Sequence, residues 1–396
     1  MTDTPSPKPS QPSRRTFVRV LGAGGIILGA SALGAGTWVT TRDPATAREP
    51  WQNAGQGDDV RVRALSYAIL APNAHNRQPW SVDLSEPGSV TLYCDLDRRL
   101  PETDPFDRQI TVSLGCFIEL FTLAAAEEGF GVEANLFPQG EPSPRLDARP
   151  VARLQLAPGN GTRDPLFAQI VNRHTNKEPF DTARSVPAGD VAAVLAASGA
   201  AGSLQAGSTL EDAKILELRE LTWRGHEIES FTPRTLQESI DLMRIGKAEV
   251  LANPDGIDLS GPLFESLNVA GLLTREQIAD TTSTAFQQGL DAYREMIFSA
   301  MGYVWLISDG DTRAEQIAAG RAYVRMHLEA TARGIDVHPL SQALQEYEEI
   351  AELYSDAKTT LGAQPTQTVQ MLARIGYGPT IKASPRWLAE TRIRNT

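Results

Sequence analysis

Apolar and polar positions follow two different periods along this chain, and the changes of period predict its elements. Apolar residues that recur at three- and four-residue steps predict helices at 60–70, 107–128 and 312–332. Shorter segments bounded by turn residues predict strands at 80–84, 89–94, 131–137, 151–156 and 302–308. Helices and strands in this mixed order indicate an α+β protein.

The second half is expected to contain helices and one long irregular segment. Residues 164–171 predict a short helix, and Pro187 is expected to open the next helix with Ser185 as its cap. Two long helical stretches, 210–230 and 235–251, precede a segment rich in turn-forming residues at 252–279. Segments of this kind can close over a binding site, so residues 235–279 are the candidate lid.

Composition and charge narrow the class of protein. The chain has 396 residues and a mass of 42.9 kDa, with 41% hydrophobic and 22% charged residues, which is enough apolar material for a folded core. The formal net charge is -12 and the pI is about 5.0. An acidic chain has no general attraction for phosphate backbones, so no nucleic-acid partner is expected.

Several common kinds of site are not predicted. The five histidines are scattered and none pairs with another at metal-ligand spacing, so no metal site is expected. Cys94 and Cys116 allow at most one disulfide, and their redox state stays open. The sequence has no nucleophile elbow of the hydrolase type, and its dense glycine cluster lies near the N-terminus instead of in a dinucleotide-binding loop.

The N-terminus has the pattern of an export signal. Arg14 and Arg15 precede an uncharged, glycine-rich stretch at 20–39, and Ala45-Thr46-Ala47 supplies the small residues that a signal peptidase reads. Residues 1–47 are therefore expected to be a twin-arginine signal cleaved after Ala47, with the Tat translocase as a partner and a periplasmic or other extracytoplasmic location. The alternative is an uncleaved segment that anchors the protein to the membrane. This route carries folded proteins, which motivates a search for a cofactor site.

Two polar stretches are the candidate site. The first, Ala71-Pro72-Asn73-Ala74-His75-Asn76-Arg77-Gln78-Pro79-Trp80, runs from a helix end into a strand and offers Asn73, His75, Asn76 and Gln78 as donors. In the second, Arg173, Thr175 and Lys177 alternate so that three donors face one side. Such donors suit an anionic or heteroaromatic ligand. The alternatives are a polar helix-terminating loop for the first stretch and a solvated charge cluster for the second.

Together the two stretches resemble the FMN-binding motifs of the FMN-dependent nitroreductase family, in particular its Acg-type branch. Arg173, Thr175 and Lys177 match an Arg-x-Ser-x-Arg-x-Phe element that holds the FMN phosphate, with Phe180 one place later than the Phe of that element. The first stretch matches an Ala-Pro-Ser-x-x-Asn-x-Gln-Pro-Trp element, with Asn73 in place of Ser. Gly320 to Gly334 and His338 to Gln342 are similar to the helix and loop that pass the flavin ring edge, and Ile375-Gly376-Tyr377-Gly378 and Arg386 are similar to the closing strand and a phosphate-contacting arginine.

The order of the motifs adds an inference about the fold. Each motif occurs once, and the order is the reverse of that in ordinary members, which bind two FMN across a homodimer. We therefore expect a nitroreductase-like, single-chain pseudo-dimer of two mixed halves, 58–160 and 164–396, with one FMN site under the lid. Whether two such chains associate stays open.

The resemblance implies an exported FMN oxidoreductase that passes electrons from NAD(P)H or another donor to a small-molecule acceptor. It implies that Arg173, Thr175, Lys177 and Arg386 hold the phosphate, and that Asn73, Asn76 and Gln78 contact the ribityl chain or ring. The backbone at Pro339, Leu340 and Ser341 would then lie at the ring edge, and no side chain is assigned as catalytic. The alternatives are an FMN-sequestering protein without turnover and a fold that has lost flavin altogether.

Overall fold

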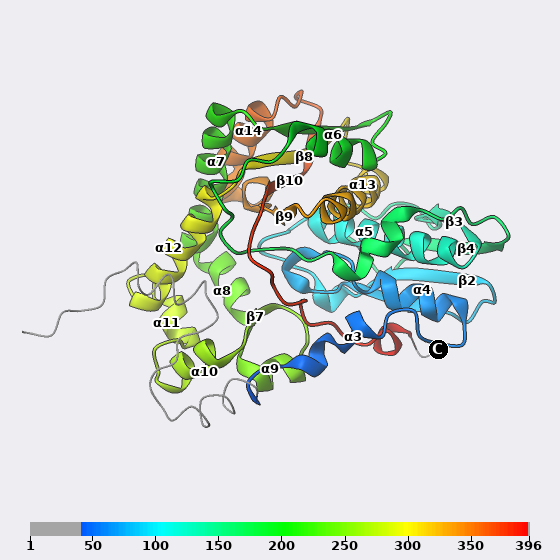
Figure 1. Ribbon diagram of the computed structural model, residues 1–396, viewed down its shortest axis with the longest axis horizontal. Coiled ribbons are helices and arrows are strands. Elements are labelled where there is room, and N and C mark those ends of the chain that lie inside the picture. The colour runs from blue at the N-terminus through cyan, green and yellow to red at the C-terminus, as the bar shows by residue number, and fades with distance from the viewer. Residues whose placement is uncertain (1–40, 395–396) are drawn as a thin grey trace, which may run out of the picture.

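Two four-stranded antiparallel sheets form the frame of the computed structural model, which describes residues 41–394 (Figure 1). The first sheet has the order β1-β2-β4-β3 and the second has the order β5-β8-β10-β9. The strands of the first sheet are β1 (Trp80–Asp83), β2 (Ser89–Cys94), β3 (Phe130–Leu136) and β4 (Ala152–Pro158). Those of the second are β5 (Leu204–Thr209), β8 (Gly302–Ser308), β9 (Asp336–Pro339) and β10 (Thr368–Gly376). The α+β class is confirmed.

The two sheets carry helices at matching places. One helix precedes the first strand of each sheet. A second helix connects β2 to β3 in the first half and β8 to β9 in the second half. These helices are α4 (Val60–Ala68) and α5 (Arg108–Glu127) in the first half, and α6 (Ala188–Ala197) and α13 (Arg313–Ala332) in the second. Helices α5 and α13 pack against each other at the centre of the molecule, between the two sheets (Figure 1). The same strand order and helix placement therefore occur twice in one chain.

The two central helices also begin and end alike. Each starts with a buried arginine, Arg108 or Arg313, and each is followed by a glycine in the left-handed region, Gly129 with φ +85 or Gly334 with φ +67. A residue with a side chain is strained at such an angle, so glycine is the natural end of a helix there. Thr312 adds a full capping box with Glu315 at the start of α13.

The helix crossing depends on two glycines that face each other. A Cβ atom at Gly115 would lie 2.3 Å from the carbonyl oxygen of Ile317, and one at Gly320 would lie 2.0 Å from that of Val112. Cys116 also approaches the carbonyl of Gly320, with its Sγ 3.1 Å from the oxygen. Only glycine permits this approach, so the two halves join backbone to backbone.

Each arginine at the start of a central helix bonds the opposite half. Arg108 donates to the carbonyl of Gln370 at 3.2 Å and pairs with Glu346 at 3.0 Å. Arg313 donates to the carbonyls of Phe106 and Pro144, both at 2.7 Å. These reciprocal bonds satisfy buried carbonyl groups at the contact between the halves.

The segment between β5 and β8 projects from the second half as a separate group of short elements, at the lower left of Figure 1. It follows α7 (Asp212–Phe231), and its elements are α8 (Pro233–Asp241), β6 (Met243–Ile245), α9 (Gly246–Ala252), β7 (Ile257–Leu259), α10 (Pro262–Val269), α11 (Arg275–Ala279) and α12 (Thr284–Phe298). The predicted continuous helix at 235–251 is wrong, because β6 interrupts it and pairs in parallel with β7. Gly246, with φ +84, makes the turn from β6 into α9.

Other differences from the predicted elements are local. Residues Pro165–Asn172 form a 3-10 helix instead of an α-helix, and Pro187 is itself the N-cap residue of α6, so Ser185 does not cap it. Helix α14 (Ala351–Thr360) precedes β10. In the described part of the chain one helix, α5, is long and apolar enough to cross a membrane, and most of it is buried in the fold. The predicted arginine pair and the stretch at 20–39 lie outside the described residues.

Candidate functional site

The loop that links α4 to β1 has an unusual backbone. His75, Asn76 and Gln78 have φ values of 46, 52 and 51, in the left-handed region that residues with side chains seldom adopt. Asn73 closes the loop from within, because its Oδ1 accepts from the backbone N–H of Gln78 at 2.7 Å. Strain of this kind persists only where the surroundings hold it, and it clusters at functional sites.

Two of the predicted ligand residues in this loop are engaged by other parts of the chain. The Asn76 amide donates to the carbonyl of Pro385 at 3.1 Å, and its Oδ1 accepts from Arg386. Gln78 is fully buried, donates to the carbonyl of Pro254 at 2.7 Å and accepts from the backbone N–H of Trp387 at 2.9 Å. These amides tie the loop to the C-terminal tail and to the lid.

Arg173 lies at the end of the 3-10 helix Pro165–Asn172 and is buried. Its Nη2 donates to the carbonyl of Leu70 at 2.9 Å, at the end of the helical turn that follows α4. Its Nη1 is 3.5 Å from Nδ1 of His327, and its Nε has no partner among the described atoms. The side chain therefore crosses from the second half to the first and keeps one unsatisfied donor.

Arg386 in the C-terminal tail reaches the same end of α4. It is buried, donates from Nε to the carbonyl of Ile69 at 3.0 Å and shares the carbonyl of Leu70 with Arg173. Arg173 and Arg386 are more than 200 positions apart in the sequence, yet both guanidinium groups donate to the carbonyl of Leu70, between the two halves. The two arginines that the resemblance assigns to the phosphate therefore lie beside the same carbonyl group.

No acid compensates these two charges in the part of the chain that the structure describes. Burial lowers the pKa of Arg173 to about 10. Burial and the nearby charge of Arg173 lower the pKa of Arg386 to about 9, so both groups remain protonated at neutral pH. Two buried cations without an anion are unfavourable in a protein interior, and a bound anion would relieve that cost.

His327 on α13 is set to accept a hydrogen bond from Arg173. Its Nε2 lies 3.1 Å from the carbonyl of His174, which can only accept, so Nε2 carries the proton. Burial and the charge of Arg173 hold the pKa of His327 well below its usual range, so the ring is neutral. The lone pair on Nδ1 then faces both the guanidinium and the hydroxyl of Tyr323, which is 3.4 Å away, and the ring adds no charge.

Lys177 adds a third cation in a partly enclosed place. Its side chain is exposed, yet the surrounding protein desolvates the ammonium and lowers its pKa, against the attraction of Asp258. Burial and the charge of Lys177 lower the pKa of His75 to about 4. His338 also has its pKa lowered well below the usual range, mainly by burial and by Arg374. The charge of Lys177 thus reaches two histidines that stay neutral.

The segment that carries Thr175 and Lys177 lies along the edge of the second sheet. Thr175 forms a parallel bridge with Val337 in β9, two residues before Pro339. The backbone N–H of Leu340 donates to the carbonyl of Leu372 at 2.9 Å, which fixes the end of β9, and Ser341 follows half-buried. The structure therefore places the predicted ring-edge residues at the end of, and just after, the strand that the phosphate motif adjoins.

Arg374, in the middle of β10, is a residue that the sequence analysis missed. It is buried, donates to the carbonyl of Glu178 at 2.8 Å and to Nδ1 of His338 at 3.1 Å, and its Cζ lies 3.8 Å from the ring centroid of Phe180. A Cβ at Gly376 would lie 2.4 Å from Phe180, which explains the glycine there. Arg374 thus holds the backbone after Lys177 in place.

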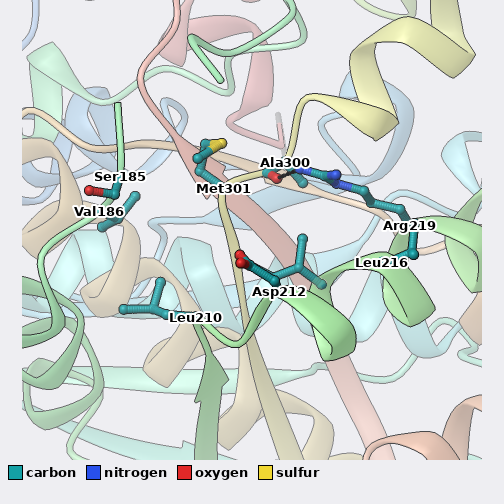
Figure 2. Close-up of a pocket in the computed structure, with 9 residues that line it drawn as sticks. Ser185, Val186, Leu210, Asp212, Leu216, Arg219, Ala300 and Met301 are labelled. Atoms are coloured by element: carbon teal, nitrogen blue, oxygen red, sulfur yellow. Dashed lines mark hydrogen bonds between the residues drawn. The ribbon is translucent and has the colours of Figure 1, made fainter. Parts of the chain in front are cut away.

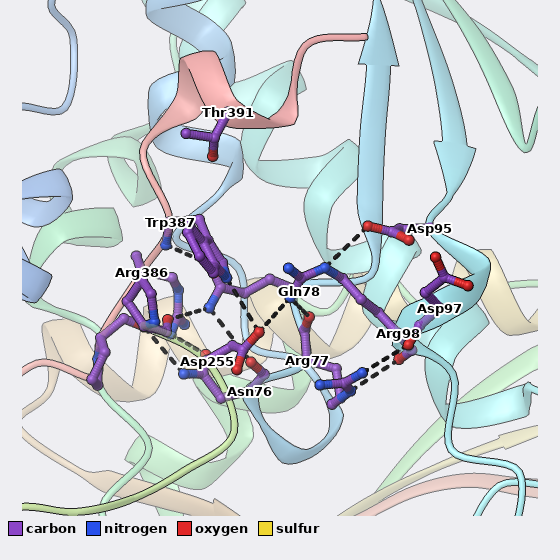
Figure 3. A network of polar contacts seen from close by, with 12 residues as sticks. Asn76, Arg77, Gln78, Asp95, Asp97, Arg98, Asp255, Arg386, Trp387 and Thr391 are labelled. Carbon is purple, nitrogen blue, oxygen red and sulfur yellow. Dashed lines mark hydrogen bonds and ion pairs between the residues drawn. The ribbon is translucent and has the colours of Figure 1, made fainter. Parts of the chain in front are cut away.

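One buried carboxylate, that of Asp255, clamps the lid to Arg98 and to the C-terminal tail, next to the loop between α4 and β1 (Figure 3). Asp255 accepts from Arg98 at 2.6 Å, from Arg244 at 2.7 Å and from the indole of Trp387 at 3.2 Å. Next to it, the backbone N–H of Gly256 donates to the carbonyl of Asn76. Burial acts to raise the pKa of Asp255, but these donors outweigh it and lower the pKa from its ordinary value of 3.8.

Asp255→Asn is expected to loosen the lid. The change leaves Arg98 and Arg244 without their shared anion, at a cost of about 2–4 kcal/mol. Amide hydrogen exchange in residues 243–259 should become at least tenfold faster. A tenfold change corresponds to about 1.4 kcal/mol in the free energy of local opening. The pKa of Asp255 is lower in the folded protein than in the unfolded chain, so protonation of Asp255 weakens the clamp. The lid should therefore also loosen as the pH falls below about 4. Asp280→Asn, an exposed change immediately after the lid, serves as control, and unchanged exchange in Asp255→Asn would contradict the clamp.

A separate cleft of about 290 Å³ lies away from these residues, between the start of α7 and the residues that precede β8 (Figure 2). Asp212, Arg219 and Met301 are among its lining residues, and Arg219 is turned toward the carbonyl of Ala300. No residue of the predicted site lines this cleft.

The chain is similar to curated proteins of Mycobacterium tuberculosis strain H37Rv that carry the name "Putative NAD(P)H nitroreductase". With Rv3131 it is 28% identical over 328 residues, which is 81% of this chain and 86% of the relative. With acg it is 35% identical over 80 residues, which is 20% of this chain and 24% of the relative. No family model matches the chain. The resemblance to nitroreductase-like proteins, acg among them, is confirmed.

Solved nitroreductases are also similar to the chain. One is the FMN-bound nitroreductase of Bacteroides fragilis, with 16% identity and a TM-score of 0.32 over 56% of this chain and 96% of that protein. Another is NfnB of Mycobacterium smegmatis in complex with NADPH, with 20% identity and a TM-score of 0.35 over 56% of this chain and 94% of that protein.

Proposed function

We propose that the protein is an exported FMN-dependent oxidoreductase with one flavin site per chain, which passes electrons from a nicotinamide or another donor to a small-molecule acceptor. The observation that carries the proposal is the pair of buried arginines, Arg173 and Arg386, with no carboxylate beside them among the described residues. The name of the relatives adds support for a nitroreductase-type activity with NAD(P)H as the electron donor.

The donor set fits the phosphate of FMN. The unpaired Nε of Arg173 and the shared positive charge call for an anion with several acceptor oxygens, which a phosphate supplies. The hydroxyl of Thr175 and the ammonium of Lys177 follow on the same extended segment toward β9. When bound, FMN supplies the hydride and electron chemistry, and the protein supplies binding, orientation and the local field.

The residues at the ring end would tune and shield this chemistry. His75 and His338 stay neutral at physiological pH because of burial and neighbouring cations, so they would act as hydrogen-bonding groups instead of charges. The clamped lid would exclude water from the same space.

We infer a fused pseudo-dimer with a single complete site. The strand order of the two sheets is the same, which supports a duplication of one unit. Between α4 and β1 the first half carries the loop with Asn73, His75, Asn76 and Gln78. The corresponding connection from α6 to β5 is shorter and consists of residues 198–203, without any of these side-chain types. One chain would then bind one FMN.

Export by the twin-arginine route belongs to the same proposal. It rests on the sequence pattern before Ala47, and it accounts for a protein that would be loaded with FMN before it leaves the cytoplasm. A fusion of residues 1–50 to a reporter that is exported only through the Tat translocase would test it. Retention of the reporter in the cytoplasm would contradict the proposed location.

The first experiment is spectroscopic. The full chain is purified from the cytoplasm of an expression host, its visible spectrum is recorded, and NADPH and then dithionite are added without oxygen. A flavin spectrum close to one FMN per chain that NADPH bleaches would support the oxidoreductase. A colourless protein that does not take up added FMN would contradict the flavin site itself.

One observation favours a second function, the sequestering of FMN without turnover. The lid is anchored to the flavin loop through Gln78 and Asn76, and Asp255 holds it to Arg98 and Trp387, which would close the site from the lid side. A bound flavin that dithionite bleaches and NADPH does not would favour this function. In that case Asp255→Asn is expected to restore reduction by NADPH, because it opens the lid.

A further inference from the structure

The segment immediately before α4 forms a strap across the candidate site. This strap, residues 41–52, contains the 3-10 turn Ala45–Arg48 and the short helix α3 (Glu49–Gln52). Its residues Pro44, Ala47, Pro50 and Trp51 are buried. The residues around Trp51 are mostly polar, yet the buried residues of the strap pack against the rest of the protein.

Trp51 covers both of the uncompensated arginines. The centre of its indole ring lies 5.8 Å from Cζ of Arg173 and 5.3 Å from Cζ of Arg386. His174 packs edge-on against the same ring at 4.9 Å, and the indole N–H donates to the carbonyl of Ser384 at 2.8 Å. The face of an aromatic ring attracts cations, so the indole orients both guanidinium groups and keeps water from them.

The strap also joins the lid to the C-terminal tail. Arg48 donates to the carbonyl of Ala383 at 2.7 Å and pairs with Asp258 in β7 at 3.4 Å. Arg42 pairs with Glu265 in α10 at 3.1 Å, and Asp43 pairs with Lys382 at 2.7 Å. Movement of the lid or of the tail away from the site therefore breaks strap contacts.

We propose that Trp51 is a positioning residue for the FMN phosphate and that the strap keeps the bound flavin from escaping. This rests on the proposed function, because it assigns the two arginines to the phosphate. An exported flavoprotein that loses its FMN cannot bind a new one where FMN is not supplied. Slow release of FMN would therefore keep the exported protein in its flavin-bound form. Cleavage after Ala47 would remove Arg42 and Asp43 with their ion pairs and leave Arg48 and Trp51, so retention in the cleaved protein is assigned to residues 48–52.

The proposal predicts a graded effect of ring chemistry on flavin release. Dissociation of FMN from the full-length holoprotein is followed by the rise in free-flavin fluorescence after dilution. Trp51→Leu should speed release about tenfold, and Trp51→Phe should fall between Leu and wild type, because phenylalanine keeps a weaker cation–π contact. Trp305→Phe in β8, outside the site, is the matched control and should release FMN at the wild-type rate.

A second variant tests the strap while Trp51 is kept. Arg48→Ala removes the contacts to Ala383 and Asp258 and should also speed release, whereas Arg153→Ala, an exposed ion-paired arginine on β4, should not. Release at the wild-type rate in both Trp51→Leu and Arg48→Ala would overturn the proposal. Wild-type protein that never holds FMN would instead overturn the proposed function. If Trp51→Leu does not fold, Trp51→Phe and Arg48→Ala decide the question.

Discussion

Arg173→Met is expected to raise the dissociation constant for FMN at least about a hundredfold, while the flavin-free protein unfolds at the same or a higher temperature. A charge-assisted bond to phosphate contributes about 1.5–3 kcal/mol, and a hundredfold change corresponds to about 2.7 kcal/mol. Methionine has a similar length and no charge. The change therefore removes a buried cation that has no counter-ion among the described residues.

The opposite signs of the two effects distinguish a binding residue from a purely structural one. Binding is measured by titration of flavin-free protein with FMN, and stability by thermal unfolding with and without FMN, because bound ligand stabilises only the variants that bind it. Arg153→Met, on the exposed face of β4, is the control for the substitution itself. Normal FMN affinity in Arg173→Met would remove Arg173 from the site. A large loss of stability without FMN would show that its bond to Leu70 is its main role.

The sheets and central helices were predictable because their signals are local. Residues 80–94 contain two short strands with a Glu86-Pro87-Gly88 turn between them, and the structure pairs Trp80 with Cys94 through Asp83 with Thr91. Helix α13 has its cap at Thr312 and its terminating glycine at Gly334 in the sequence itself. These features need no knowledge of distant residues.

The lid was predicted less well because a tertiary contact decides its structure. Met243-Arg244-Ile245 continues the apolar pattern of the helix before it, yet it forms β6 by pairing with residues 257–259. Helical spacing cannot distinguish the two outcomes when the partner strand is only three residues long. The β-turn residues Asn253 to Gly256, in contrast, were visible, and Asp255 among them holds the clamp.

The site was predicted through its motifs, and the sequence could not tell which motif residues would be free to bind a ligand. Arg173 and Arg386 both reach the carbonyl of Leu70, whereas Asn76 and Gln78 direct their amides to Pro385 and Pro254. Trp51 was missed because its surroundings are polar and rich in glycine and glutamine. A lone tryptophan in such a segment was the available signal, since large aromatic residues are seldom left in solvent.

The repeated arrangement of the two halves also has a trace in the sequence. Arg108, Gly115 and Gly129 have the same spacing as Arg313, Gly320 and Gly334, although most residues between them differ. The retained positions are the ones that geometry restricts: a buried arginine at the helix start, a glycine at the crossing and a glycine after the helix. The contact between the halves therefore depends on a few positions that cannot tolerate another residue.

Gly320→Ala is accordingly expected to lower the free energy of unfolding by at least about 3 kcal/mol, in spite of the higher helix propensity of alanine. The added Cβ would lie 2.0 Å from the carbonyl oxygen of Val112 and 2.9 Å from Cα of Gly115, so backbone atoms of both helices would have to separate. Since the halves meet at this crossing and Arg173 bridges them at Leu70, FMN affinity should fall as well. Unfolding by denaturant and FMN titration measure the two effects.

Gly289→Ala is the matched control, because Gly289 also lies inside a helix, α12, and an added Cβ there meets no atom within 4 Å. Without a clash, the remaining effect is the higher helix propensity of alanine, which also restricts the unfolded backbone more than glycine does. This change should therefore stabilise the protein by about 0.5–1 kcal/mol. The same substitution should thus have opposite signs at two helical glycines. Equal effects at both sites would mean that the α5–α13 crossing can relax, and the two halves would then be joined less tightly than their glycine contact indicates.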